Sequence, residues 1–239
     1  RDKLAEVLGV TPEDVERASF VSYMRVIRKK KDFPPAVAYK FRGALYLNIT
    51  NSCTNNCRFC PRTNGRFFFY GHNLNLLVEP GVEDVVSKAL EELGASEAKE
   101  IVFCGYGEPT SRLSDILEIA GKLKQTGIPI RLNTNGHGNI IHGRDIVPEL
   151  EQVFDAVSVS VNAPDSEKYM EMCRPDFGAG TYEQVLDFVK KCAESRMKTI
   201  VTAVDIPDVD IEALKKIVSG IQGVDFKLRR FYNFGGELD

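Results

Sequence analysis

Residues 45–60 read LYLNITNSCTNNCRFC, an apolar stretch that runs directly into a polar, cysteine-bearing one. The first half predicts a strand over residues 45–50, and the second predicts a loop that carries Cys53, Cys57 and Cys60. The spacing C-x3-C-x2-C places three thiolates on one loop, where each can bind one iron of a cubane cluster and leave the fourth iron open. Catalytic metal sites keep such an open position, whereas structural sites are closed.

A zinc site is the alternative reading of these cysteines. Zinc normally takes a fourth Cys or His ligand, and His72 is the next such residue along the chain. A disulfide scaffold is excluded because six cysteines in 239 residues are too sparse for one. The clustering of three of them indicates metal ligation in a reducing compartment, and we expect a cytoplasmic protein.

Downstream of the cysteine loop, strand and helix patterns alternate. We expect strands over residues 45–50, 100–105, 130–135, 156–162, 199–204 and 226–231, and helices over 82–93, 113–126, 144–154, 181–195 and 211–220. Strict βα alternation predicts an α/β fold with a parallel sheet. A flavodoxin-like open sheet and a partial barrel fit this pattern equally well. In both architectures ligands bind at the carboxyl ends of the strands.

The first 35 residues form a separate N-terminal segment. Residues 11–14, TPED, predict a helix start with a Thr cap, Pro in the first turn and acidic residues after it. Residues 32–35 then break the helix and serve as a linker. We therefore divide the chain into an N-terminal helical segment with its linker, residues 1–35, and a core domain, residues 36–239.

Composition restricts the class of partner. A net charge of −3 and 43% hydrophobic residues indicate a globular domain without the basic excess of a bulk nucleic-acid binder. No run approaches the roughly 18 apolar residues of a membrane span, and the first residues do not resemble a signal peptide. We expect no membrane association.

Polar residues lie on, or directly after, three of the predicted strands. Residues 105–109 read GYGEP, a glycine-rich turn in which the backbone can approach a ligand and Glu108 can pair with an ammonium group. On the next strand Asn133 and Asn135 share a face with Arg131. The strand over 156–162 has Val157, Val159 and Val161 on one face and, on the other, Ser158, Ser160 and Asn162. We expect the apolar face to pack on helices and the polar face to line a wet interior, although a satisfied polar layer in the barrel is an alternative.

The cysteine loop, with Phe59 before its third cysteine, and the GYGEP turn together resemble the radical S-adenosylmethionine (SAM) superfamily. The resemblance implies a partial (βα)6 TIM-type barrel, a [4Fe–4S] cluster held by Cys53, Cys57 and Cys60, and SAM as the second cofactor. It implies that the GYGEP turn binds the amino group of SAM and that Arg174 binds its carboxylate. It also implies that Ser160 and Asn162 contact the ribose and that Val201 contacts the adenine. The expected SAM-binding residues are Gly105, Tyr106, Gly107, Glu108, Asn133, Asn135, Ser160, Asn162 and Arg174.

The chemistry implied by this resemblance is reductive cleavage of SAM to a 5′-deoxyadenosyl radical, which abstracts hydrogen from a substrate. A low-potential electron donor of the flavodoxin or ferredoxin type is the implied partner. Arg229 or Arg230 can bind an anionic substrate group, and strand alternation allows only one of them to point inward. The substrate itself and the catalytic residues are unknown. So little chain follows the last strand that a macromolecular substrate or a partner subunit could close the barrel.

A closer resemblance is to the TatD-associated radical SAM proteins. It rests on residues 47–60, on GYGEPT at 105–110 and on RRFYNFG at 229–235. Residues 4–27 resemble the final helices of TatD-type hydrolases, so a TatD-type hydrolase, fused or separate, is a candidate partner. Two rival classes are a zinc or electron-transfer module without SAM chemistry, and an interaction subunit that docks to a nuclease.

Three cysteines fall outside the cysteine loop. Cys192 is expected in a helix core, whereas Cys104 or Cys173 could be a thiol near the substrate rather than part of the core. The aromatic run over residues 67–70 could shield the cluster or the substrate, or simply pack under the barrel.

Overall fold

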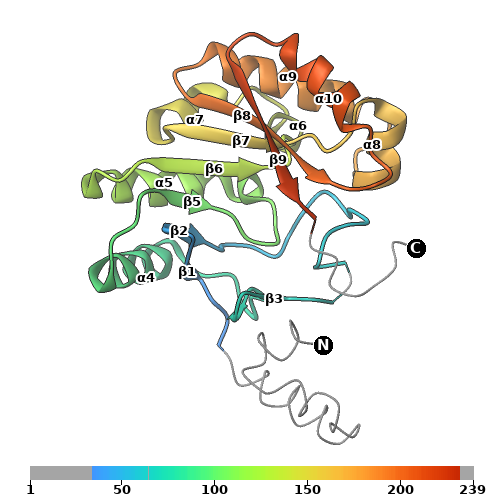
Figure 1. Ribbon diagram of the computed structural model, residues 1–239. Helices are drawn as coiled ribbons and strands as arrows, with labels where there is room; N and C mark the ends of the chain where they lie inside the picture. The colour runs from blue at the N-terminus through green and yellow to red at the C-terminus, as the bar shows by residue number, and fades with distance from the viewer. Residues whose placement is uncertain (1–33, 64, 232–239) are drawn as a thin grey trace, which may run out of the picture.

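Six parallel strands in chain order form the centre of the fold in the computed structural model, which describes residues 34–63 and 65–231 (Figure 1). The sheet has seven strands in the order β1-β2-β5-β6-β7-β8-β9, and β1 pairs antiparallel to β2. The strands are β1 (Ala38–Phe41), β2 (Ala44–Leu47), β5 (Ile101–Phe103), β6 (Ile130–Thr134), β7 (Ala156–Ser160), β8 (Lys198–Asp205) and β9 (Val224–Arg230). A separate hairpin consists of β3 (Phe68–Phe69) and β4 (His72–Asn73).

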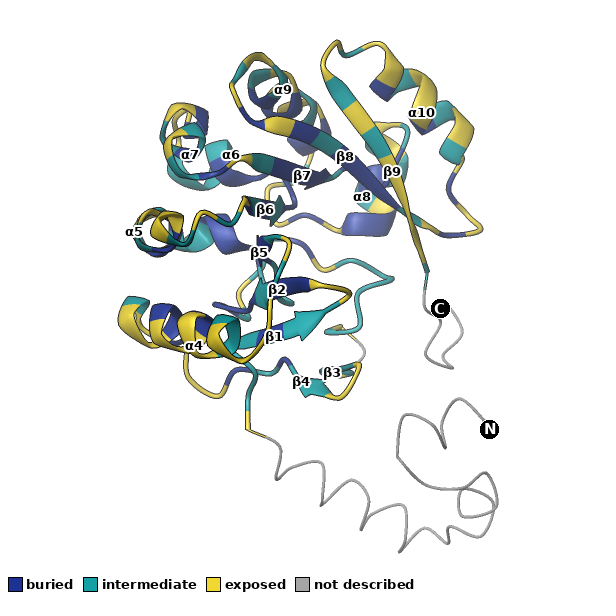
Figure 2. Ribbon diagram, turned by 60° about the vertical axis from the view of Figure 1, so that its left-hand side comes forward, coloured by how far each residue is buried: buried dark blue, intermediate teal, exposed yellow. Residues whose placement is uncertain are grey.

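The helices form an outer arc around the strands (Figure 2). They are α4 (Val82–Ala95), α5 (Leu113–Leu123), α6 (Gly138–His142), α7 (Val147–Val153), α8 (Ser166–Cys173), α9 (Thr181–Glu194) and α10 (Ile211–Ser219). Two short 3-10 turns are η1 (Pro109–Arg112) and η2 (Lys124–Thr126). Within the described residues, no helix is long and apolar enough to cross a bilayer.

Strand order decides between the two predicted architectures. A flavodoxin-like sheet reverses direction at a switch point, but here each parallel strand lies beside the next one in sequence. Repeated right-handed crossovers in one direction place the helices on one side of the sheet and curve it into a barrel. Among the described strands β9 has no pairing with β1 or β2, so the barrel stays open. The predicted partial barrel with parallel strands is confirmed.

The core lies between the strands and the arc of helices. In β6 alternation is clear: Ile130 and Leu132 are fully buried towards the helices, whereas Arg131 and Asn133 are half-buried on the other face. Burying the apolar faces of the strands against the helices stabilises the sheet by roughly 25 cal/mol per Å² of apolar surface removed from water.

The six parallel strands and five of the helices were predicted from periodicity. The predictions missed the β1–β2 hairpin, the β3–β4 hairpin and the short helices α6 and α8. The β1–β2 turn has positive φ angles at Arg42 (50°) and Gly43 (79°), the backbone of a two-residue hairpin turn. Arginine rarely adopts that conformation, which conceals the turn in the sequence. The predicted helix over residues 11 onward lies outside the described residues.

Candidate functional site

The cysteine loop leaves β2 at the carboxyl end of the sheet, as predicted. Cys53, Cys57 and Cys60 are all half-buried free thiols in this loop. The base of the loop is fixed by Asn48, whose fully buried amide nitrogen donates to the carbonyl oxygens of Ala36 and Leu74, both at 3.0 Å. A rigid base holds the three thiols in one region at the mouth of the barrel.

N–H groups approach the sulfur atom of Cys53. The Asn55 amide lies 3.5 Å from Cys53 Sγ, and Asn135 Nδ2 lies 3.8 Å from the same atom. At Cys60, Thr63 N donates to the carbonyl oxygen at 3.1 Å. Burial raises the pKa of Cys53 to about 12 and raises that of Cys60, so both thiols favour the neutral form until a metal replaces the proton. Donors of this kind are suited to sulfur atoms that carry negative charge.

Residues 172–176, at and after the end of α8, lie along the cysteine loop and form hydrogen bonds with its backbone. Asn56 N donates to Cys173 O at 3.0 Å, and Arg58 N donates to Met172 O at 2.9 Å. Asp176 N donates to the carbonyl oxygen of Thr54 at 2.9 Å. These backbone bonds fix the loop without using any of the three thiols.

A buried side-chain network lies under the loop. His137 is fully buried, with Nδ1 2.7 Å from Thr54 Oγ1 and Nε2 2.8 Å from the hydroxyl oxygen of Tyr169. Burial lowers the pKa of His137 to about 4, so the ring is neutral at pH 7. Neither residue was predicted. His137 follows the end of a predicted strand by a few residues, and that position was the available signal.

The GYGEP turn packs tightly against the start of the cysteine loop. A Cβ added at Gly107 would lie 2.3 Å from the carbonyl oxygen of Thr50, and one added at Gly105 would lie 2.0 Å from Asn48 Oδ1. Glu108 N donates to Ser52 O at 2.7 Å. The two glycines are therefore required for close approach of two backbones.

The Glu108 carboxylate turns inward. One oxygen accepts from Thr110 N at 3.0 Å and Thr134 Oγ1 at 2.8 Å, and the other accepts from Asn135 N at 2.6 Å. Only 2% of the residue is exposed, and burial raises the pKa of the carboxyl group. The carboxylate therefore ties the turn to the end of β6, and its expected contact with the amino group of SAM stays a prediction.

Tyr106 is the second residue of the GYGEP turn. Its ring meets Phe67 edge to face, with centroids 6.1 Å apart, and its buried hydroxyl group has no hydrogen-bond partner. Burial raises the pKa of this phenol, and the neighbouring Cys60 and Cys104 raise it further. The rest of the aromatic run packs on β1: the Phe69 ring lies 4.9 Å from that of Phe41.

The polar face of β7 carries Ser160 as predicted. Ser160 Oγ lies 3.3 Å from Thr202 Oγ1 of β8, and Arg229 Nη2 of β9 donates to it at 3.2 Å. This contact shows that Arg229, not Arg230, points towards Ser160. Val201 is fully buried in the core, and strand alternation puts Thr202 rather than Val201 beside Ser160. The adenine contact expected of Val201 stays a prediction.

Asn162 braces the ends of two strands. It has a left-handed backbone with φ 61°, its Oδ1 accepts from Val204 N at 3.1 Å, and its Nδ2 donates to Ser160 O at 3.3 Å. Its amide replaces ladder hydrogen bonds where β7 ends. The ribose contacts expected of Ser160 and Asn162 stay predictions.

Two further residues predicted to bind SAM, Asn135 and Asn133, differ in what they contact: the first bonds the cysteine loop and the second bonds a side chain of the sheet. Asn135 is buried and bonds both Thr54 Oγ1, at 3.0 Å, and the Glu108 carboxylate, so it connects β6 with the cysteine loop. Asn133 accepts a hydrogen bond from Arg131, which also forms a bidentate pair with Glu100. Arg131 thereby lowers the pKa of the Glu100 carboxyl group.

Arg174 is exposed at the end of α8 in a left-handed conformation, with φ 47°. Its carbonyl oxygen accepts from Asn56 N at 3.2 Å. Its guanidinium group has no carboxylate within ion-pair distance among the described residues, and the carboxylate grip stays a prediction.

The three extra cysteines differ in their surroundings. Cys192 is fully buried in the core, as expected for a helix residue. Cys173 is fully buried beside the cysteine loop, where its hydrogen bond with Cys57, followed by burial, raises the pKa of Cys57 well above the ordinary value. Cys104 is half-buried at the end of β5.

The zinc alternative needs ligands that converge on one ion. Within residues 34–63 and 65–231, no three His, Cys, Asp or Glu side chains converge in that way. The ring of His72 lies against Tyr39, with centroids 4.9 Å apart. A cubane distributes its thiolates over three irons and does not need them at one point.

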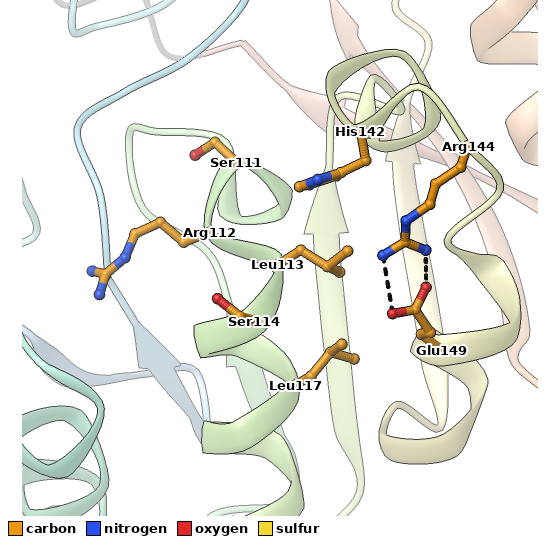
Figure 3. Close-up of a pocket in the computed structure, with 8 residues that line it drawn as sticks. All are labelled: Ser111, Arg112, Leu113, Ser114, Leu117, His142, Arg144 and Glu149. Carbon is orange, nitrogen blue, oxygen red and sulfur yellow. Dashed lines mark hydrogen bonds and ion pairs between the residues drawn. The ribbon is translucent and has the colours of Figure 1, made fainter.

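A cavity of about 370 Å³ lies outside the barrel, between α5 and the α6–α7 segment (Figure 3). None of the predicted site residues lines it. Its polar groups are mostly engaged: Arg144 pairs with Glu149, and His142 Nε2 lies 2.8 Å from Thr110 O. The candidate site is therefore at the strand ends and not in this cavity.

The family model of the radical SAM superfamily matches residues 47–219, most of the chain. The chain belongs to the radical SAM superfamily. This is a family of enzymes that use a [4Fe–4S] cluster and SAM, so the predicted family and its cofactors are confirmed.

Two curated relatives are similar over the same region. A Methanocaldococcus jannaschii protein described as a glycyl-radical enzyme activating enzyme is 26% identical over 172 residues, 70% of this chain and 65% of its own length. GTP 3′,8-cyclase of Clostridium perfringens is 23% identical over 177 residues, 73% of this chain and 50% of its own length. The chain therefore spans less than two thirds of the length of either relative.

Solved structures share the fold at low identity. Streptococcus suis SuiB bound to its precursor peptide SuiA has a TM-score of 0.61 and 18% identity, over 89% of this chain and 44% of that one. Methylornithine synthase has a TM-score of 0.55 and 14% identity, over 97% and 64% of the two chains. These similarities show the fold alone.

The residues present fit a [4Fe–4S] cluster. The donor set is three thiols on one loop, two N–H groups approach the sulfur atom of Cys53, and Asn55 Oδ1 and Tyr106 OH are buried beside the loop without partners. Buried polar atoms normally have partners, so unpartnered ones around a thiol loop indicate that a polar group binds there.

Proposed function

We propose that this chain is a radical SAM enzyme in which Cys53, Cys57 and Cys60 hold the cluster and the strand ends beside it hold SAM. When bound, the cluster supplies the electron that cleaves SAM to the 5′-deoxyadenosyl radical, which removes a hydrogen atom from the substrate. The observation that carries the proposal is the cysteine loop itself: three half-buried thiols, one of them approached by N–H donors, at the carboxyl ends of a parallel barrel.

On the SAM side, the chain supplies backbone groups from the GYGEP turn and side chains from three strands. Gly105 and Gly107 allow the turn to approach the cysteine loop, and Glu108 positions the turn from behind. Ser160 presents its hydroxyl group beside Thr202 and Arg229 for the ribose. Arg174 is a cation with no carboxylate partner among the described residues, suited to the SAM carboxylate.

The sequence supports three proposals about partners and substrate. A low-potential flavodoxin or ferredoxin supplies the electron, as radical SAM enzymes generally need a reducing partner. The open side of the barrel between β9 and β1 leaves room for a macromolecular substrate or a partner subunit. A TatD-type hydrolase is the proposed partner on the strength of the sequence resemblance at residues 47–60, 105–110 and 229–235.

Anaerobic reconstitution with iron and sulfide, followed by electron paramagnetic resonance (EPR) of the dithionite-reduced protein, tests the proposal. We expect a [4Fe–4S]⁺ signal that changes when SAM is added, because SAM binds the open iron. Cys57→Ser should lose the signal, and Cys192→Ala, which removes a thiol from the helix core, should keep it. A signal indifferent to SAM, or stoichiometric zinc without a cluster, would show that the proposal is wrong.

A further inference from the structure

Arg62 is a cation placed inside the cysteine loop. It is the second residue after Cys60, and its Nη2 donates to the carbonyl oxygen of Asn55 at 2.7 Å. Asn55 is the second residue after Cys53. The half-buried side chain therefore folds back across the loop and brings its guanidinium group to the segment between the first and second cysteines.

The charge of Arg62 has no protein counter-ion in the described part of the chain. No carboxylate lies within ion-pair distance of it, and its buried Nε has no acceptor. A buried cation is costly unless an opposite charge and hydrogen-bond acceptors compensate it. The second arginine of the loop differs on the first point: Arg58 Nη1 lies 2.6 Å from the Glu171 carboxylate.

Arg62 spans the loop between its cysteines. Its backbone follows Cys60 by two residues, and its guanidinium group reaches the carbonyl oxygen of Asn55, which lies between Cys53 and Cys57 in the sequence. The cation therefore lies within the segment that carries all three thiols, and its charge is attracted to negative charge on them.

We propose that Arg62 is the counter-ion of the cluster and raises its reduction potential. Three thiolates give the oxidised cluster a net negative charge, and reduction adds another. A fixed cation with no other counter-ion stabilises the reduced form more than the oxidised form, because net charge and hydrogen bonds to sulfur set the potentials of such clusters. Arg62 is a positioning and electrostatic residue: it makes no bond in the reaction. The inference rests on the proposed function, since it requires the cluster.

The test is an EPR-monitored redox titration of the reconstituted full chain without SAM. Arg62→Gln should make the midpoint potential more negative by about 59 mV. For a one-electron couple this is a tenfold change in the equilibrium constant of reduction. Arg62→Lys keeps the charge and should stay nearer the wild type. Arg58→Gln is the matched control: it removes an arginine from the same loop whose charge Glu171 already balances, and should shift the potential less.

The possible outcomes separate this inference from the proposed function. Equal potentials in the wild type and Arg62→Gln, or a larger shift in Arg58→Gln, overturn the inference. The proposed function still holds in those cases, because the wild-type protein shows the cluster signal. If Arg62→Gln fails to hold the cluster, iron retention in Arg62→Lys supports the role of charge, and loss in both variants overturns it. A wild-type chain that binds no cluster instead removes the proposed function itself.

Discussion

The cysteine loop and the edge strand β9 are built differently. The loop is fixed from three directions, by β6 through Asn135, by α8 through backbone bonds and from below by His137. β9 pairs with β8 alone, and most of its residues are exposed. Its Arg229 side chain reaches β7, where Nη2 lies 3.2 Å from Ser160 Oγ.

This difference follows from what each region must do. A cluster with three protein ligands tolerates little movement, since its thiols must reach fixed positions, and buried networks with satisfied partners supply that rigidity. An edge strand has one free side and can meet a variable group there. We infer that the cofactor end is preorganised by the chain and that the β9 side is left for the substrate.

Of the substitutions that test this difference, Tyr169→Phe is expected to have the largest effect on stability and on iron retention. The change removes the hydroxyl group that lies 2.8 Å from His137 Nε2 and leaves a buried ring nitrogen unpaired. An unsatisfied buried polar group costs about 1–3 kcal/mol. We expect a lower free energy of unfolding in urea and faster loss of iron from the reconstituted protein to a chelator.

Tyr182→Phe is the matched control for that prediction. Tyr182 is also buried and donates a hydrogen bond at 2.8 Å, but its acceptor is Pro164 O, away from the cysteine loop. It should cost about 1 kcal/mol of stability and leave iron release unchanged. Equal iron-release rates in the two variants would show that the network under the loop does not fix it.

A smaller effect is expected from pH. The pKa of His137 is lowered by burial from 6.5 to about 4, so the unfolded chain binds a proton more readily than the folded one. Its contribution to stability is complete above pH 6.5 and is lost as the pH falls towards 4. The slope contributed by one group is at most about 1.4 kcal/mol per pH unit.

Urea unfolding of the cluster-free, reduced chain between pH 7 and pH 5 measures this slope. The wild type should lose stability with acid more steeply than His137→Gln, which lacks the titrating ring. The comparison of slopes removes the contribution of Glu108, whose raised pKa is present in both proteins. Parallel curves would contradict the buried, neutral state of His137.

The sequence was sufficient for features that depend on local patterns. Alternation along residues 156–162 correctly put the valines of β7 in the core and Ser160 on the polar face. The βα order predicted the parallel sheet, and the change from an apolar to a polar stretch predicted that the cysteine loop follows β2. These conclusions use contacts between neighbours in sequence or a period that the backbone geometry fixes.

Other features depend on partners distant in sequence. Glu108 carries the charge expected of an ammonium ligand, but Thr134 and Asn135 of another strand take up its oxygens. The His137–Tyr169 contact joins a strand end to a helix that was not predicted. Asn162 looks like a ligand residue in sequence and becomes a brace because its backbone turns left-handed. Such contacts exist only once the barrel is formed.

The smallest effect, and the most direct test of the β9 side, is expected from Arg229→Gln. The side chain is exposed on an edge strand, so the free energy of unfolding should change by no more than about 0.5 kcal/mol. Its hydrogen bond to Ser160 Oγ orients the hydroxyl group proposed for the SAM ribose. Loss of a hydrogen bond worth about 1 kcal/mol should weaken SAM binding about fivefold, as measured by equilibrium dialysis of the reconstituted protein. Arg230→Gln, one residue further along the same strand but on its other face, should leave the affinity unchanged. If both variants weaken binding equally, the effect comes from net charge on β9, and the assignment of Arg229 to the site fails.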